Sequence, residues 1–133
     1  MILPITSLYA SLLVLIILFL AFKVGSTRGK LDISLGDGDN PEMLEAIRRH
    51  GNAIENVPIA VFLMALIEAN EAHAVFLHTL GAVLVLARIL HPMGLKADKM
   101  NDLLRGLGAG GTVLVMVVSA VYLIWAAVQS LLP

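Results

Sequence analysis

Two long stretches of this sequence carry no charged side chain, and they limit the possible folds more than any other feature. One covers residues 1–22 and the other residues 107–128. A helix rises about 1.5 Å per residue, so each stretch reaches roughly 30 Å, the thickness of the hydrocarbon core of a bilayer. The first does not fit a secretory signal, because no Lys or Arg precedes it and basic residues follow it. Both stretches predict membrane-spanning helices.

The composition of the chain also indicates a membrane protein. Of the 133 residues, 59% are hydrophobic and 14% are charged, whereas soluble domains are about 25% charged. The formal net charge is −1, which leaves no basic excess for binding nucleic acid. Cysteine is absent, and this excludes disulfides and thiolate metal sites. We therefore expect residues 1–133 to form one integral membrane domain, and we exclude a soluble enzyme.

Two further spans are predicted between these stretches. Asn40 is a good helix cap, Pro41 fits the first helical position, and Glu42 favours the positive end of the helix dipole. A later helix is expected to end before Pro92, because a proline disfavours helix in the preceding residue. The fold class is therefore an all-α membrane protein, a four-transmembrane-helix bundle. Its predicted helices cover about 3–24, 41–69, 72–91 and 99–129, with a cytoplasmic loop over 25–40.

The distribution of basic residues predicts the orientation in the membrane. All nine Lys and Arg residues lie at or beside the first and third connections, and the second connection, residues 68–73, has none. Cytoplasmic loops of membrane proteins carry the excess of basic residues. We therefore expect the first and third connections in the cytoplasm and both termini on the outer, periplasmic side.

One face of the second predicted helix carries polar side chains near the apolar zone. Arg48, Asn52 and Glu55 follow the i, i+4, i+7 spacing that stacks side chains on one face. A charge at a helix centre costs roughly 2.5–3.5 kcal/mol on insertion scales and less near the interface. Residues placed there at such a cost are functional candidates.

Three more polar residues belong with this face. Arg88 and His91 are three positions apart on the third helix, and Arg105 opens the fourth. All lie toward the predicted cytoplasmic side, so they are expected to form a polar pocket with excess positive charge. Such a pocket suits a small anionic molecule that also carries an amine. The structural alternative is an interhelical ion pair between Glu55 and Arg88, with Arg48 reaching the surface.

Other patterns carry less functional meaning. The G-x-G-x-x-G pattern that begins at Gly106 lacks the preceding strand that a dinucleotide site needs. We expect Gly106 and Gly110 to let helices approach closely instead. His73 and His78 are five positions apart, a poor spacing for a metal on a helix, so no metal site is predicted. Glu68 is expected to be a solvated helix end.

The second predicted helix resembles a known family. Its run from Arg48 to Pro58, RRHGNAIENVP, is similar to the second-helix signature of the MAPEG family, membrane-associated proteins in eicosanoid and glutathione metabolism. The preceding LGDGDNPE, residues 35–42, looks like the loop of the bacterial branch. The Arg88-x-x-His91 pair resembles a third-helix motif of some members. The four-span layout extends the resemblance over essentially the whole chain.

The resemblance implies a function and an assembly. It implies a homotrimer in the bacterial inner membrane, with glutathione held between neighbouring subunits near the cytoplasmic face. Glutathione S-transferase or peroxidase activity toward lipophilic electrophiles is expected, with Arg105 stabilising the thiolate. One of Lys23, Arg28 and Lys30 is expected to replace the basic contacts of the family's first loop. The residues expected to contact the tripeptide are Arg48, Asn52, Glu55, Arg88 and His91.

The sequence also departs from the family pattern. Members with synthase activity carry tyrosines where this chain has Asn56 or Pro58, Leu95 and Ala109. An alternative is therefore a non-catalytic membrane protein of the same fold that binds another anionic metabolite or a lipid headgroup. A transporter is disfavoured, because the fourth helix is apolar through the middle of the membrane.

Overall fold

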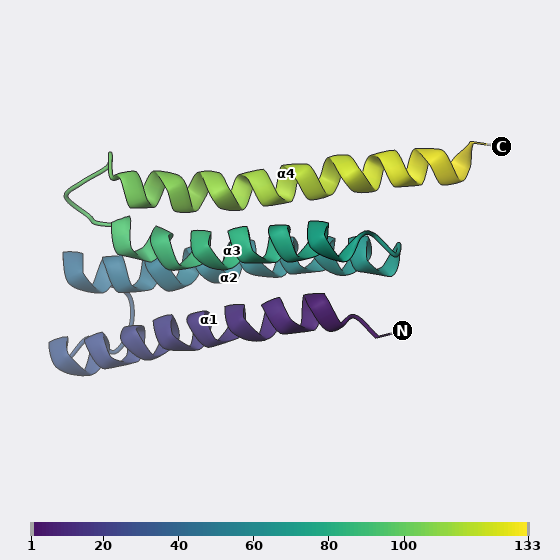
Figure 1. Cartoon of the computed structure of the whole chain (residues 1–133). Coiled ribbons are helices and arrows are strands. Elements are labelled where there is room, and N and C mark those ends of the chain that lie inside the picture. The colour runs from purple at the N-terminus through teal and green to yellow at the C-terminus, as the bar shows by residue number, and fades with distance from the viewer. Residues whose placement is uncertain (1, 133) are drawn as a thin grey trace.

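The computed structural model describes residues 2–132 and confirms the predicted fold class. Its described part is an all-α bundle of four helices: α1 (Pro4–Leu31), α2 (Pro41–Ala69), α3 (Ala74–Gly94) and α4 (Leu103–Leu131). Each is long and apolar enough to cross a membrane. Figure 1 shows α2 and α3 at the centre, with α1 and α4 on opposite sides of that pair.

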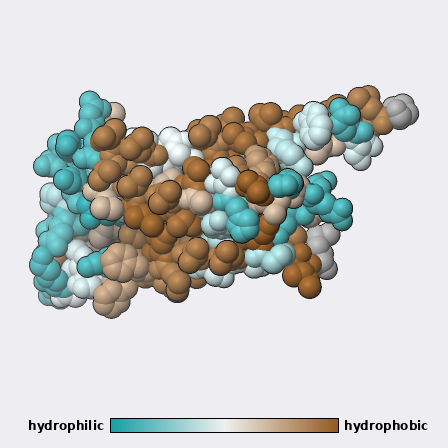
Figure 2. Space-filling model, in the orientation of Figure 1, coloured by the Kyte–Doolittle hydropathy of each residue, from teal (hydrophilic) through white to brown (hydrophobic). Residues whose placement is uncertain are grey.

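The core of the bundle is small, and many large apolar side chains point outward. Leu13, Met64, Leu84 and Val115, one from each helix, are buried in one cluster. The outer faces expose many other large apolar side chains, such as Phe62. Figure 2 shows a broad hydrophobic band across the middle of the molecule. A soluble protein would bury such a surface, so this band is the expected contact with lipid.

The two ends of the bundle differ. The connections 32–40 and 95–102 lie at one end, which we call the basic end because the Lys and Arg side chains gather near it. Both termini lie toward the other end, which we call the terminal end (Figure 1). The connection 70–73 also lies at the terminal end, since α2 and α3 run antiparallel.

Helix α1 is longer than the sequence indicated. It ends at Leu31 rather than near residue 24, so the first connection covers 32–40 rather than 25–40. The helix stops where Asp32 adopts a left-handed conformation, with φ 54°, and its N–H bonds to the carbonyl of Arg28. The consequence is that Lys23, Arg28 and Lys30 project from a helix instead of a loop.

The turn between α3 and α4 is also displaced. Helix α3 continues through Pro92 to Gly94, which is possible because a proline this near the end removes only one helical hydrogen bond. Helix α4 begins at Leu103 rather than near residue 99, because Asp102 caps it by accepting a hydrogen bond from the Leu104 N–H at 3.0 Å.

The start of α2, near the candidate residues, and the start of α1, at the terminal end, are also capped by side chains. Asn40 accepts hydrogen bonds from the first N–H groups of α2, as its residue type predicts. Glu68, expected to be solvated, instead accepts the N–H groups of Ile5 at 2.9 Å and Thr6 at 2.7 Å. The expectation was wrong because the carboxylate meets the start of α1, where unpaired N–H groups attract negative charge.

Candidate functional site

The polar face of α2 lies open on the side of the bundle. Arg48 reaches along its own helix to Glu55, with 3.4 Å between Nη1 and Oε1, and both side chains are about half exposed (52% and 54%). Gly51 lies between them, and a methyl group there would only touch them. An exposed ion pair of this kind contributes little to stability, about 0–1 kcal/mol. Arg48 and Glu55 are therefore free to exchange this contact for one with a ligand.

Arg88 lies beneath this face and joins three helices. Its side chain is buried, with 3% of the residue exposed. One guanidinium nitrogen donates to Asn52 Oδ1 at 3.0 Å and another donates to the Gly108 carbonyl at 3.0 Å. Thr112 donates to the same carbonyl at 2.9 Å. We call the contact of Asn52, Arg88 and Gly108 the interior junction.

The interior junction excludes the structural alternative of an ion pair between Glu55 and Arg88. Glu55 pairs with Arg48, and the hydrogen-bond partners of Arg88 are an amide oxygen and a backbone carbonyl. A buried guanidinium that is paired with neutral groups still carries its full charge in a medium of low dielectric. Such an uncompensated charge attracts an anion, which makes Arg88 a candidate binding residue.

His91 lies next to the interior junction, where α3 and α4 approach each other closely. The imidazole is buried. A Cβ at Gly108 would lie 2.5 Å from the His91 backbone nitrogen, whereas a Cβ at Gly106 or Gly110 would meet nothing within 4 Å. Within the single chain Gly108, and not the expected Gly106 and Gly110, forms the close contact between helices, because α4 is rotated so that Gly108 faces α3.

Arg105 lies in the first turn of α4, over the end of α3. Its backbone nitrogen packs against Gly94, three residues beyond His91 on α3. Within residues 2–132 its side chain has no hydrogen bond or ion pair. The structure therefore brings Arg105 near His91 without joining it to the interior junction.

The cap of α4 holds Arg105 at this place. Asp102 pairs with Lys99 at 3.2 Å. Bonding from Lys99, and from the backbone N–H groups of Leu104 and Arg105, holds the pKa of the Asp102 carboxyl below its ordinary value. The cap is thus ionised at neutral pH, and the first turn of α4 is stabilised by it.

A second polar face of α2 was not identified as part of a site from the sequence. Arg49 pairs with Glu45 at 2.6 Å, as the i, i+4 spacing predicts. Arg49 also donates twice to the Leu95 carbonyl, at 3.0 and 2.7 Å, and Glu45 accepts from the Ala97 N–H at 2.8 Å. The pair therefore fastens the connection 95–102 to α2. No sequence signal links Arg49 to Leu95, because their contact depends on tertiary packing.

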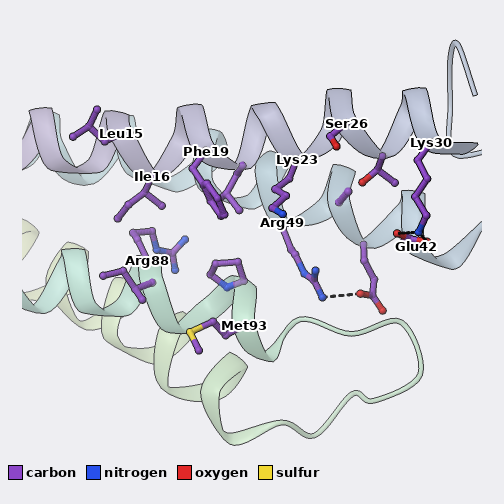
Figure 3. Close-up of a pocket in the computed structure, with 16 residues that line it drawn as sticks. Leu15, Ile16, Phe19, Lys23, Ser26, Lys30, Glu42, Arg49, Arg88 and Met93 are labelled. Atoms are coloured by element: carbon purple, nitrogen blue, oxygen red, sulfur yellow. Dashed lines mark hydrogen bonds and ion pairs between the residues drawn. The ribbon is translucent and has the colours of Figure 1, made fainter.

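The basic side chains of α1 differ in their partners. Arg28 donates to the carbonyls of Ile33 and Gly36 and so holds the first connection. Lys30 pairs with Glu42 at 2.8 Å. Lys23 lies 5.5 Å from the ring centre of Phe19, a cation–π contact. Lys23 and Lys30 line a cleft of about 850 Å³ between α1, α2 and α3, drawn in Figure 3.

Comparisons with known proteins identify a family and two relatives of this chain. The sequence model of the MAPEG family matches residues 6–125. The chain is 35% identical over 129 residues to the inner membrane protein YecN of Escherichia coli strain K12, covering 96% of this chain and 98% of that protein. The YecN protein of Escherichia coli O6:H1 strain CFT073 matches to the same extent. The family match and the nearly complete relative together show that this chain belongs to the MAPEG family.

Proposed function

We propose that this chain binds glutathione at the open face of α2 and uses it against lipophilic electrophiles, as a transferase or a peroxidase. The observation that carries the proposal is the exposed pair of Arg48 and Glu55 directly above the buried charge of Arg88. One carboxylate beside two guanidinium groups matches a tripeptide that carries two carboxylates and one ammonium group. Family membership supports the same assignment.

The roles of the residues follow from their chemistry. Arg48 is suited to hold a carboxylate through paired N–H donors, and Glu55 is suited to accept from the ammonium group. The Oδ1 of Asn52 accepts from Arg88, so its Nδ2 amide group is the part that can donate to a ligand. His91 and Arg88 provide the base of the site. In this proposal each side chain contacts a part of the ligand that has the opposite charge or the complementary hydrogen-bonding group.

Arg105 is proposed to stabilise the thiolate. A guanidinium stays protonated and lowers the pKa of a nearby thiol. Each unit of lowering corresponds to about 1.4 kcal/mol of thiolate stabilisation. The thiolate then attacks an electrophilic carbon, a carbon–sulfur bond forms, and the leaving group departs with its electron pair. The lack of a competing partner supports this role, because the Arg105 side chain has no hydrogen bond or ion pair within residues 2–132.

We also propose a homotrimer in a bacterial inner membrane. Arg48 and Glu55 lie on the outside of a single chain, so a ligand there is covered on one side only. A neighbouring subunit placed against α2 would close the site. Lys and Arg at the basic end favour a cytoplasmic position for it, which leaves both termini in the periplasm. The name of the Escherichia coli relative, an inner membrane protein, supports the location.

The experiment is a glutathione titration of the purified chain, followed by isothermal calorimetry for binding and by ultraviolet absorbance for the thiolate. Arg48→Ala is expected to weaken binding, whereas Arg105→Ala keeps binding and loses the thiolate signal. Lys96→Ala removes an exposed charge from the same end of the bundle and is the matched control. Absence of binding at millimolar glutathione, or an unchanged thiolate signal in Arg105→Ala, would refute the proposal.

A second candidate function is ligand binding without catalysis. It is favoured by the positions of the tyrosines. Tyr9 bonds to His78, and Tyr122 packs on Phe76, toward the terminal end, whereas the family's tyrosine positions hold other residues here. The two functions separate in one assay with a general electrophile such as a chloronitrobenzene. Glutathione binding without any conjugate favours the non-catalytic function.

A further inference from the structure

The last two turns of α1, residues 25–31, have little support from the rest of the bundle. The last buried side chain of α1 is Leu20, although the helix continues to Leu31. Residues 25–31 also follow the uncharged stretch 1–22, so we expect them in contact with water. Most of the stability of a helix in a protein comes from packing one of its faces. Residues 25–31, which we call the α1 strap, therefore lack the usual source of helix stability.

The residue types in the α1 strap also disfavour a helix. Residues 25–29 are GSTRG, and glycine is the poorest helix former after proline. Close packing explains other glycines of the bundle, since a Cβ at Gly81 would overlap the ring of Tyr9. A Cβ at Gly25 or Gly29 would meet nothing within 4 Å. Packing therefore does not require these two glycines, and their effect is to weaken the helix.

One weak contact attaches the α1 strap to another helix. Lys30 pairs with Glu42 of α2 at 2.8 Å, and the two side chains are 65% and 52% exposed. Figure 3 shows this pair at the basic end of the cleft. Within residues 2–132 no other hydrogen bond or ion pair joins the strap to a helix, because Arg28 bonds to carbonyls of the connection 32–40. Exposed ion pairs stabilise little and are screened by salt.

The first turns of α2 lie at the same end of the bundle and are held firmly. Asn40 caps them, and the side chains of Met43 and Ala46 are buried. Glu45 and Arg49 bind the backbone of the connection 95–102. The two helices therefore differ in support although they meet the same surroundings, and the first turns of α2 serve as an internal reference for the α1 strap.

The α1 strap forms part of the wall of the cleft between α1, α2 and α3. Ser26, Thr27 and Lys30 line the cleft together with Ala46 and Arg88. Ala46 and Arg88 are both buried. A strap that leaves its place would therefore expose to water groups that the folded strap helps to cover.

We propose that the α1 strap unwinds reversibly from helix to coil while the bundle stays folded, and that this motion opens the cleft to water at the basic end. Unwinding leaves the core intact, since no strap residue is buried. The pair of Lys30 and Glu42 acts as a latch, which salt or a competing anion releases. The proposal concerns a motion of the chain and does not rest on glutathione binding, which Arg48→Ala tests separately.

The first test is hydrogen exchange of the full chain in an uncharged detergent, followed by mass spectrometry. Amide exchange is expected to be faster in residues 25–31 than in residues 41–49, because local opening exposes the amides of weakly supported segments first. Gly25→Ala combined with Gly29→Ala is expected to slow exchange in the strap roughly 20-fold, the product of about 0.8–1.0 kcal/mol for each substitution. Residues 41–49 should keep their exchange rate.

The latch is tested by Glu42→Gln, which is expected to speed exchange in the strap about twofold, the value of an exposed ion pair. High salt should speed exchange in the parent chain to the same extent and should have no further effect in Glu42→Gln. Asp39→Asn is the matched control, because Asp39 has no ion pair within residues 2–132. This control should exchange as the parent chain does.

The opening of the cleft is tested with a thiol, since the chain has no cysteine of its own. Ala46→Cys places one in the cleft behind the strap, where a negatively charged methanethiosulfonate reagent reaches it only from water. Adding Gly25→Ala and Gly29→Ala should slow its modification by the same factor as the exchange. Exchange in the strap as slow as in residues 41–49, or equal modification rates with and without the two alanines, would overturn the proposal.

Discussion

The two polar faces of α2 carry the same types of residue and use them in opposite ways. On one face Arg49 and Glu45 bind the backbone of the connection 95–102. On the other face Arg48 and Glu55 bind only each other and stay half exposed. The comparison shows that the residue type alone does not separate structure from function in this bundle. What separates the two ion pairs is whether their charged groups also bond to another segment of the chain.

The largest loss of stability is expected from a substitution at the interior junction, because this junction depends on the close approach of α3 and α4. Gly108→Ala places a Cβ 2.5 Å from the His91 backbone, so the helices must separate. We expect a loss of about 2–3 kcal/mol of unfolding free energy, typical of overpacking. Unfolding in mixed micelles with increasing dodecyl sulfate, followed by circular dichroism, measures it.

Gly110→Ala is the matched control for that substitution. A Cβ at Gly110 meets nothing within 4 Å, and alanine favours helix over glycine by about 0.8–1.0 kcal/mol. The control is therefore expected to be at least as stable as the parent chain. Equal losses in the two variants would show that the packing of α4 on α3 is not the one described.

A second test compares the two faces directly. Arg49→Ala removes two hydrogen bonds to Leu95 and the partner of Glu45, so we expect a loss of about 1–2 kcal/mol. Arg48→Ala removes only an exposed pair, and we expect a change within about 0.5 kcal/mol. The same unfolding titration measures both variants.

Glutathione affinity should rank the two variants in the opposite order to stability. Arg48→Ala is expected to weaken glutathione binding by about tenfold, which corresponds to one charge-assisted contact. Arg49→Ala should keep most of the affinity, since Arg49 faces the other side of α2. If Arg49→Ala lost more affinity than Arg48→Ala, the assignment of the two faces would be reversed.

The smallest effect concerns pH and the cap of α4. The pKa of Asp102 is lowered in the folded chain from its ordinary value of 3.8. The stabilisation is therefore complete above this value and is lost as the pH falls through the lower pKa of the folded state. Asp102→Asn should show a weaker decline of stability with acidification over this range than the parent chain. Identical pH profiles would indicate that the ionisation of Asp102 contributes nothing to stability.

The sequence predicted the membrane spans well, for a simple physical reason. A stretch long enough to cross a bilayer without a charge, such as residues 1–22, has few other structures open to it. The exact ends were harder. Helix α1 stops at Asp32 in a left-handed conformation, which Asp adopts more often than most residues but still uncommonly, so the residue type gives only a weak signal.

The sequence predicted which residues of the candidate site share a helix face, but it did not predict which residues contact one another. The spacing of Arg48, Asn52 and Glu55 places them on one side of a helix whatever surrounds it. The partner of Arg88 depends on how α2 and α3 are rotated about their axes, and this rotation selects Asn52 instead of Glu55. The rotation of α4 selects Gly108 in the same way.

The most direct test of the central claim is an experimental structure of the purified chain saturated with glutathione. Our account predicts the tripeptide against Arg48, Asn52 and Glu55, between neighbouring subunits, with its sulfur facing Arg105. Glutathione found in the cleft between α1, α2 and α3, or absent from the open face of α2 under saturating conditions, would contradict the account.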